Sequence, residues 1–423
     1  MQPATNLYDD KQEPESAHII NEETQKSFYE ALESDLVDNR GKQGQKHYLP
    51  FVLFSFIIAI LHKKQKKASI QRFMVNKHTV LCKLTEHSSE KAVSQAQLGR
   101  ILSTVDWESL NTINEKHLGL TILNEKNSKK ETIWLSGDGK DLKGGVQVNA
   151  SHTSSVRGEV SIRLVEQESK KVVAQSFYDG DKESEKTHMR ALMQKQKLSH
   201  RSITLDAIHC DPKTTELIAL NEGIYLIPAK DNQEYLVKDL LSEARRQKED
   251  KRFVQITTHD KGHGRIEKRE YTLFDVSKQN FDSRWHTSSI RSLVMVYRQR
   301  EMMSKNKENK IVKKEEHTAY FISNTCAKDL KIETLKQLSK AIRGRWSIET
   351  DNYIRDVTLG EDNIKTQKGN RTRSEATLRT IALEWLKCEN PKNFNALLDN
   401  FADSELFLTN FLIKYRFIPI NTT

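Results

Sequence analysis

The 423-residue sequence has few cysteines and prolines and no long apolar run. Its four cysteines are scattered and form no C-x-x-C pair, which argues against a zinc ribbon or a disulfide scaffold and fits a reducing cytoplasm. The longest apolar run, Leu49–Leu61, covers 13 residues, whereas a membrane-spanning helix needs about 20. The run also follows an acidic segment far from the N-terminus, unlike a signal peptide. We therefore expect it to form a buried helix.

The sequence also lacks a phosphate-binding loop, because no G-x-x-x-x-G-K-[ST] pattern occurs in it. Any phosphate chemistry must therefore depend on metal ions or on basic side chains. Hydrophobic residues make up 36% of the chain and charged residues 30%, as in a soluble protein with a large polar surface. The length allows two or three domains.

The charge is unevenly distributed along the chain. Residues 1–40 contain ten acidic and three basic residues, so they carry −7, and the remainder carries +17 of the net +10. A body this basic indicates a polyanionic partner, either nucleic acid or an anionic membrane surface. The alternative, a basic protein without such a partner, is equally consistent with the charge alone.

Local patterns predict an acidic leader, a helical domain and a larger α/β domain. Residues 1–45 are polar and are expected to be partly disordered, with a short helical patch at 26–37. Four helical patterns follow within residues 46–125, at 49–61, 69–84, 94–103 and 104–117. Ser94 is the expected N-cap of the third. This domain is either a DNA-binding unit or a helical bundle that supports the next domain.

Strands and helices alternate in residues 130–390. The patterns predict strands at 132–138, 158–166, 171–177, 201–206 and 224–229, and helices at 186–197 and 212–221. This order mixes hairpins with βαβ units, so the expected fold class is α/β with a mixed sheet and flanking helices. Residues 235–330 are charged and contain only strand-like pieces. Helical patterns return at 333–357, 373–386 and 394–412, the last in a C-terminal segment at 391–423.

Two aspartates end apolar strands in this pattern. Asp138 is followed by Gly139, and Asp206 is followed by Ala207. Two carboxylates at neighbouring strand ends raise each other's pKa unless a divalent cation neutralises them, and oxygen ligands suit Mg²⁺ or Mn²⁺. The alternative is a pair of ordinary strand-end acids that face water.

A third acid lies on the helix predicted at 333–357. An apolar stripe runs along this helix through Leu335, Leu338, Ile342 and Trp346. Glu349 lies between this stripe and a polar one that includes Arg345, so its carboxylate can reach over the strand ends. The alternative is a surface ion pair between Arg345 and Glu349. We expect Trp346 in the core, with stacking on a DNA base as the alternative.

Six short strings surround these acids. They are Gly137–Lys140, Thr204–Ile208, Ala229–Gln233, Gly262–Arg269, Arg345–Glu349 and Arg355–Asp362. As an ordered series they resemble the transposases of the ISAs1 family, including the H-repeat-associated proteins. The resemblance covers residues 45–390, and residues 94–102 are similar to the N-terminal domain associated with that family.

The resemblance implies a DDE-superfamily transposase with a ribonuclease-H-like core in residues 130–390 and a β-rich insertion at about 240–325. It implies that Asp138, Asp206 and Glu349 are catalytic and bind two Mg²⁺ or Mn²⁺ ions. The implied reaction is cleavage and strand transfer at the terminal inverted repeats of an insertion sequence. The implied partner is double-stranded DNA, bound by a homodimer or higher oligomer in the bacterial cytoplasm, at the nucleoid.

Related transposases share a signature of Tyr, two residues, Arg, three residues, Glu, six residues and Lys. This sequence departs from it at two of the four positions. Arg345 and Glu349 match this signature, whereas Ile342 replaces the Tyr and Asp356 replaces the Lys. The roles of that Tyr and Lys at the terminal phosphates are therefore open here.

Basic and polar residues near the acids are candidates for DNA binding. They are Lys140, Lys230, Asn232, Gln233, His263, Arg265, Arg269 and Arg345. For Lys230–Gln233 the alternative is a polar turn capped by Asn232. For residues 263–269 the alternative is an ion-pair cluster with Glu267.

Three other functions remain open from the sequence. A metal-dependent DNA nuclease that does not transpose would have the same core. A DNA-binding relic that has lost catalysis would retain much of the sequence, and the departures at Ile342 and Asp356 leave room for it. A membrane-surface protein has only the basic charge in its favour.

Overall fold

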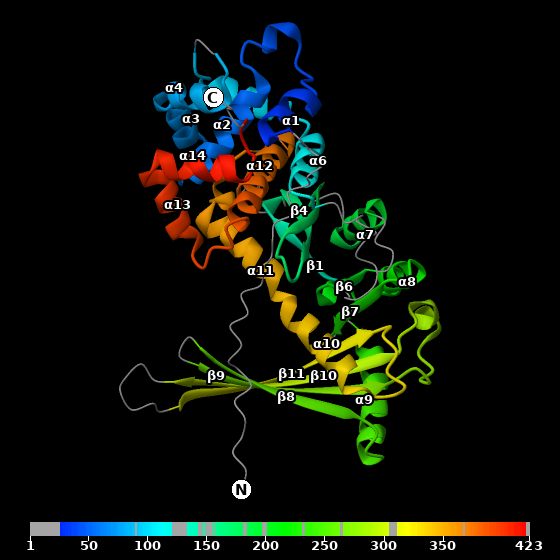
Figure 1. Cartoon of the computed structure of the whole chain (residues 1–423). Coiled ribbons are helices and arrows are strands. Elements are labelled where there is room, and N and C mark those ends of the chain that lie inside the picture. The colour runs from blue at the N-terminus through cyan, green and yellow to red at the C-terminus, as the bar shows by residue number, and fades with distance from the viewer. Residues whose placement is uncertain are drawn as a thin grey trace.

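A computed structural model describes most of the chain (Figure 1). The described residues are 26–88, 91–120, 133–142, 147–148, 155–156, 158–180, 184–196, 201–230, 233–262, 265–303, 311–366 and 369–419. Most of the acidic leader and two predicted site residues, Asn232 and His263, lie outside them. In Figure 1 a helical unit, blue and red, lies at one end and a long sheet at the other.

The N-terminal part of the helical unit is close to the predicted pattern. Its helices are α1 (Phe28–Asp35), α2 (Leu49–Leu61), α3 (Lys67–Asn76), α4 (His78–Thr85), α5 (Gln95–Leu102) and α6 (Trp107–His117), with a short 3₁₀ turn η1 (Lys42–Gly44). Ser94 caps α5 through a reciprocal capping box with Gln97, as expected. The single helix predicted at 69–84 is wrong, because the backbone of Lys77 leaves the helical region and separates α3 from α4.

Helix α2 is the centre of this unit and is buried along its whole length. The segment Lys42–Leu61 is long and apolar enough to cross a membrane by composition, but 72% of its apolar window is buried inside the protein. Three late helices share its core: α12 (Gly369–Lys387), α13 (Phe394–Asp403) and α14 (Glu405–Lys414). Trp385 of α12, for example, stacks on Phe417 at 3.8 Å between ring centroids. The two ends of the chain therefore form one hydrophobic core.

The predicted mixed sheet is present. Its first part contains β1 (Trp134–Asp141), β4 (Glu159–Glu166), β5 (Val172–Asp179), β6 (Ser202–Thr204) and β7 (Ile224–Ala229). They lie side by side in the order β5-β4-β1-β6-β7. The first three are antiparallel, and β6 and β7 run parallel to β1, which is the ribonuclease-H-like arrangement. Helices α7 (Glu185–Lys195) and α8 (Pro212–Leu220) connect these strands, and β2 (Gln147–Val148) pairs with β3 (Ser155–Val156) apart from them.

Four long strands extend the same sheet beyond β7. They are β8 (Val254–Gly262), β9 (Arg265–Asp275), β10 (Ser292–Met303) and β11 (Ile311–Ser323). Because β11 pairs antiparallel with β7, these four strands and the five of the first part form one nine-stranded sheet. The region predicted to be irregular also contains α9 (Glu234–Glu249), whose buried residues Leu236, Leu240 and Ala244 follow helical spacing that the sequence analysis overlooked.

The long helix predicted at 333–357 is present as three consecutive helical segments, and the residues at the two junctions, Arg345 and Ile354, keep right-handed helical backbone angles. Helix α10 (Ile332–Gly344) ends at a glycine packed against Gln167, where a Cβ would meet the Gln167 side chain. Helix α11 (Trp346–Tyr353) begins after Arg345 and continues into a π-helical turn, η7 (Ile354–Thr358). A 3₁₀ turn, η8 (Glu361–Asn363), precedes α12. The apolar stripe of α10 therefore does not continue along α11.

Candidate active site

The parallel pairing of β1 with β6 brings Asp138 and Asp206 to the same level. The last residue pair of that register is Ser136 with Thr204, and each aspartate lies two residues further along its own chain. Neighbouring strands are about 4.8 Å apart, so the two carboxyl groups lie at adjacent positions across the sheet. Their closeness follows from register alone.

Asp138 does not end its strand, contrary to the sequence prediction. Strand β1 continues to Asp141, and Asp138 pairs opposite Arg163 of β4. Its side chain is therefore enclosed on more sides than a strand-end acid would be. Burial, together with the carboxylates of Glu185 and Asp206, raises the pKa of Asp138 to about 6. Burial is the largest cause of this rise, and the two neighbouring carboxylates add to it.

Helix α11 brings the third acid to the same place. Arg345, at its N-terminus, lies 3.9 Å from Asp206 (Nη1 to Oδ1) and 3.4 Å from Glu349 (Nη2 to Oε1). One turn further along, Asn352 donates a hydrogen bond of 3.2 Å from Nδ2 to Oδ2 of Asp138. The predicted pair of Arg345 and Glu349 is therefore present, but it is shared with Asp206. Arg345 therefore joins Glu349 to Asp206 at the start of α11, and Asn352 joins Asp138 to the same helix near its end.

The donor set suits a hard divalent cation. The acids offer only carboxylate oxygens, the ligands that Mg²⁺ and Mn²⁺ prefer. Among the described residues, no three acidic, histidine or cysteine side chains are close enough to hold one ion as they stand. The guanidinium of Arg345 lies between two of the acids and supplies positive charge where a cation would bind. The carboxylate oxygens are therefore suitable ligands for a divalent ion, provided that the Arg345 side chain moves away from Asp206 and Glu349.

A fourth carboxylate, Glu185 in the first turn of α7, was not among the predicted site residues. Its carboxyl group lies against Gly139, where a Cβ would come within 2.5 Å of its Cδ atom. His209, whose side chain is fully buried, contacts Glu185 at 3.1 Å (Nε2 to Oε1). The sequence signals were Gly139 directly after Asp138, which permits close approach, and His209 three residues after Asp206.

Lys140, predicted to bind DNA, lies in an ion-pair cluster instead. Its ammonium group is 2.5 Å from Asp356, 2.8 Å from Glu361 and 3.7 Å from Asp362, and its side chain is only 11% exposed. The alternating pleat of β1 explains this position, since Asp138 and Lys140 share one face of the strand. Asp356, the residue that replaces the signature Lys, is therefore a partner of Lys140.

The other predicted DNA-binding residues are dispersed. Lys230 is exposed directly after β7, and Arg265 is exposed at the start of β9. Gln233 donates a hydrogen bond to the carbonyl oxygen of Cys210. Arg269 forms ion pairs with Asp260 and Glu267, which was the alternative for that segment.

Trp346 is exposed, contrary to the prediction that it lies in the core. Its exposed fraction is 54%. Leu335 and Leu338, which belong to the same predicted stripe, are both buried. The spacing therefore predicted the buried side of α10 correctly and failed where the stripe reaches α11.

Known proteins share part of this sequence. Residues 163–385, more than half of the chain, match the family described as Transposase DDE domain. That range includes Asp206 and Glu349, whereas Asp138 precedes it. Two Escherichia coli K12 proteins, "Putative protein YbfL" and "H repeat-associated putative transposase YhhI", are each 28% identical over 222 residues, 51% of this chain. The aligned segment spans 54% of either relative, about half of its length.

Two further proteins are similar over more of the chain. "Putative transposase YncI" of Escherichia coli O157:H7 is 22% identical over 366 residues, which is 84% of this chain and 86% of its own. A piggyBac transposase, solved as a synaptic complex with hairpin DNA, aligns with 88% of this chain and 73% of its own, at 11% identity and a TM-score of 0.42. A structural likeness this weak adds nothing to the argument from the site.

Proposed function

This chain belongs to the family of transposase DDE domains, and on that premise we propose that it is the DNA transposase of an insertion sequence. The proposed reaction is metal-dependent strand cleavage and strand transfer at terminal inverted repeats. The observation that supports the proposal is that three carboxylates lie around one helix, α11: Arg345 is near Asp206 and Glu349, and Asn352 bonds to Asp138, whose pKa is raised. The ISAs1 family is the proposed subfamily.

Asp138, Asp206 and Glu349 would hold the divalent ions, with Mg²⁺ as the expected ion and Mn²⁺ as a substitute. When bound, two such ions activate water and stabilise the leaving 3′ oxygen in an in-line displacement. The protein contributes the alignment of the acids, because β1, β6 and α11 all meet at this point. Asn352 orients the Asp138 carboxylate through its hydrogen bond.

Arg345 has a second proposed role at the same site. Once the acids are neutralised, its guanidinium is free to contact the non-bridging oxygens of the scissile phosphate. Lys230 and Arg265, which are exposed, are proposed to contact DNA backbone further away. The +17 charge of the chain beyond residue 40 would attract the duplex over a long range.

The remaining parts of the proposal concern assembly and location. The helical unit built on α2 is proposed to contact the terminal repeats. Two or more copies are proposed to act together on the two ends of the element, in the bacterial cytoplasm at the nucleoid.

The test incubates purified protein with labelled DNA that carries the element's terminal repeats, with Mg²⁺ or with EDTA. We expect nicks at the repeat ends and joined products with Mg²⁺, and neither with EDTA. Asp206→Asn should abolish both products, whereas Glu168→Gln, an exposed acid elsewhere in the sheet region, should not.

Other results would decide between the alternatives. Nicks without joined products would favour the non-transposing nuclease. Binding of the repeats without any cleavage would favour a DNA-binding relic that has lost catalysis. The replacement of the signature Lys by Asp356 is compatible with such a loss. Full activity of Asp206→Asn would contradict the proposed site.

A further inference from the structure

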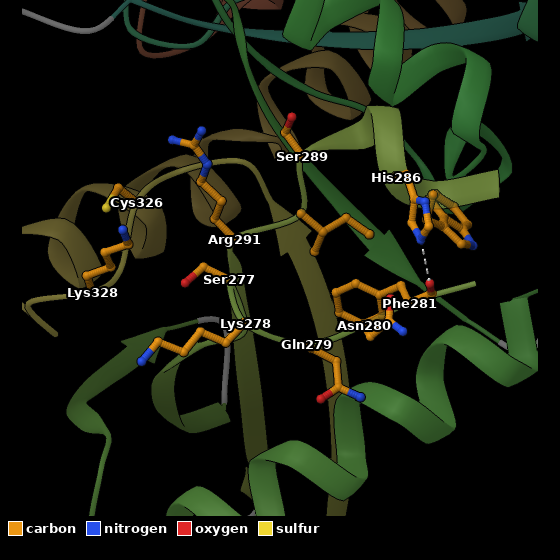
Figure 2. A pocket seen from close by; sticks show the side chains of 12 residues that line it. Ser277, Lys278, Gln279, Asn280, Phe281, His286, Ser289, Arg291, Cys326 and Lys328 are labelled. Atoms are coloured by element: carbon orange, nitrogen blue, oxygen red, sulfur yellow. Dashed lines mark hydrogen bonds between the residues drawn. The ribbon is translucent and has the colours of Figure 1, made fainter. Parts of the chain in front are cut away.

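A separate pocket lies between the turns that follow β9 and β11, and it shares no residue with the acidic site. The pocket encloses about 480 Å³. Its walls are residues 277–281, 285–286 and 289–291, together with Cys326 and Lys328 (Figure 2). A volume of this size lies in the range of small-molecule sites, which is about 300–1,000 Å³.

The charge of this pocket is of one sign. Lys278, Arg291 and Lys328 line it, and no acidic residue does. Within the described part of the chain, these three cations form no ion pair. The nearby acids Asp282 and Asp329 instead pair with Arg284 and Lys331, which do not line the pocket. The pocket therefore presents three uncompensated positive charges.

The opposite wall is aromatic. Figure 2 shows Lys278, Arg291 and Lys328 toward one side of the pocket and His286 and Phe281 toward the other. Trp285 also lines the pocket. The pocket thus combines a cationic side with a side of flat rings.

Two polar groups in the wall lack partners among the described residues. The indole N–H of Trp285 has no acceptor although the side chain is only 2% exposed, and the Ser277 hydroxyl has none either. A buried donor without an acceptor costs about 1–3 kcal/mol. Both atoms are closed to solvent, so a ligand would contact the wall that covers them and not the atoms themselves.

The frame of the pocket is held by hydrogen bonds to the rest of the sheet region. The Arg291 backbone N–H donates to the carbonyl of Ser323, and the Tyr225 hydroxyl donates to the carbonyl of Ser288. His286 donates from Nε2 to the carbonyl of Phe281 at 3.1 Å, as the dashed line in Figure 2 marks. The pocket is therefore formed without a ligand.

We propose that this pocket binds one nucleotide unit, with its phosphate on Lys278, Arg291 and Lys328 and its base against the aromatic wall. A phosphate satisfies unpaired cations, and a base can stack on a flat exposed ring, which in this pocket is that of His286. The unit can come from a single-stranded DNA segment or from a free mononucleotide, since both share this chemistry. The inference does not depend on the proposed cleavage activity.

Cys326 provides a direct readout of occupancy. It lines the pocket and is exposed, whereas Cys210 and Cys388 are buried and Cys82 lies in α4. The rate of its alkylation by a maleimide, followed by mass spectrometry, reports access to the pocket. The ligands are deoxyadenosine monophosphate, tetradeoxyadenylate and inorganic phosphate, and Cys82 is the internal control.

We expect one or both adenine ligands to slow the alkylation of Cys326 and to leave that of Cys82 unchanged. Protection by the tetranucleotide alone identifies DNA as the source, and protection by the mononucleotide alone identifies free nucleotide. Arg291→Gln should weaken the protecting affinity about tenfold or more, as expected for a lost charge-assisted hydrogen bond. Lys331→Gln, a neighbouring cation outside the pocket, should not.

Three results would overturn the proposal. They are no protection by either adenine ligand, protection by inorganic phosphate as strong as by the nucleotides, and unchanged protection in Arg291→Gln. Because Arg291 is exposed, its substitution should leave the thermal unfolding temperature unchanged, which the same samples can verify.

Discussion

Two clusters of charged residues begin two residues apart on β1 and have opposite characters. Asp138 is buried in a cluster with two neighbouring acids, Glu185 and Asp206, and one nearby arginine, and burial and these carboxylates raise its pKa to about 6. Lys140 belongs to a cluster in which acids and bases alternate, and it includes the fully buried Glu361. Burial alone would raise the pKa of Glu361, but the charges of Arg163 and Lys140 lower it to about 2.

The second cluster continues through the protein. Arg163 contacts Glu361 at 2.8 Å, Arg355 contacts Asp351 at 2.7 Å, and Asp351 contacts Lys387 of α12 at 2.7 Å. These contacts tie β4, α11, η7 and α12 together. The cluster around Asp138, in which negative charge is in excess (the unbalanced cluster), is therefore suited to bind a cation. The cluster around Lys140, in which the charges of acids and bases offset each other (the balanced cluster), is suited to hold α11 against the sheet.

The largest expected effect comes from removing a charge of the unbalanced cluster. Asp138→Asn should lower the rate of DNA cleavage at least about a thousandfold, equivalent to about 4 kcal/mol, because the site loses a metal ligand. Cleavage of labelled repeat DNA under single-turnover conditions measures the effect. Thermal unfolding should be unchanged or slightly higher, since repulsion among the acids is relieved. A variant that cleaves normally would remove Asp138 from the site.

The next effect comes from removing a charge of the balanced cluster. Glu361→Gln should lower the free energy of unfolding by about 3–5 kcal/mol, because it leaves Arg163 and Lys140 buried without their shared partner. Urea unfolding measures the loss, and Glu249→Gln, an exposed acid on α9, is the matched control. Equal stability of both variants would show that the buried network contributes nothing to stability.

The two clusters should also respond to pH in opposite directions. The folded-state pKa of Asp138 lies above its ordinary value of 3.8, so the folded protein retains a proton between about pH 4 and 6 that the unfolded chain has lost. Its contribution to stability therefore falls as the pH rises through that window. For Glu361 the folded-state pKa of about 2 lies below 4.5, so its contribution is present above pH 4.5 and is lost toward pH 2.

Stability curves against pH for the wild type, Asp138→Asn and Glu361→Gln test this contrast. The advantage of Asp138→Asn over the wild type should grow by about 1–2 kcal/mol between pH 4 and pH 7, after allowance for solvent screening. Saturating Mg²⁺ should stabilise the wild type and reverse that advantage. The deficit of Glu361→Gln should instead shrink toward low pH. If the free energies of unfolding of the two variants, each relative to the wild type, changed with pH in the same direction, the proposed contrast would be wrong.

The smallest effect concerns the fourth acid. Glu185→Gln removes a negative charge beside Asp138, so the pKa of Asp138 should fall, with a change in stability below about 1 kcal/mol. The midpoint of the Asp138 titration, followed by carbon NMR of the carboxyl group, measures this shift. Glu168→Gln should leave the midpoint in place. An unchanged midpoint in Glu185→Gln would place that carboxylate outside the cluster.

The sequence predicted much of the local structure. Helix α2 coincides with the apolar run, the cap at Ser94 starts α5, and the strand order that leads to the mixed sheet was predicted from alternating patterns. These features depend on residues within one or two turns of each other, and local patterns report on them directly. The pattern also placed Asp138 and Asp206 at the ends of two predicted strands, and the structure shows that these strands are neighbours.

Three of the errors share a different cause. The end of β1, the break at Gly344 and the exposure of Trp346 all depend on residues distant in sequence. Pairing with β4 extends β1 to Asp141, and close contact with Gln167 accompanies the end of α10. No local pattern contains these partners.

The sequence by itself determined which residues could carry chemistry, because the acids, their flanking glycine and the order of strands and helices are written in short segments. Only the tertiary structure decided how they are used. It paired Lys140 with Asp356 and Glu361 rather than leaving it exposed, and it brought Glu185 to Gly139. The reason is physical: the pKa and the partners of a charged group depend on all charges within a few ångströms, whatever their separation along the chain.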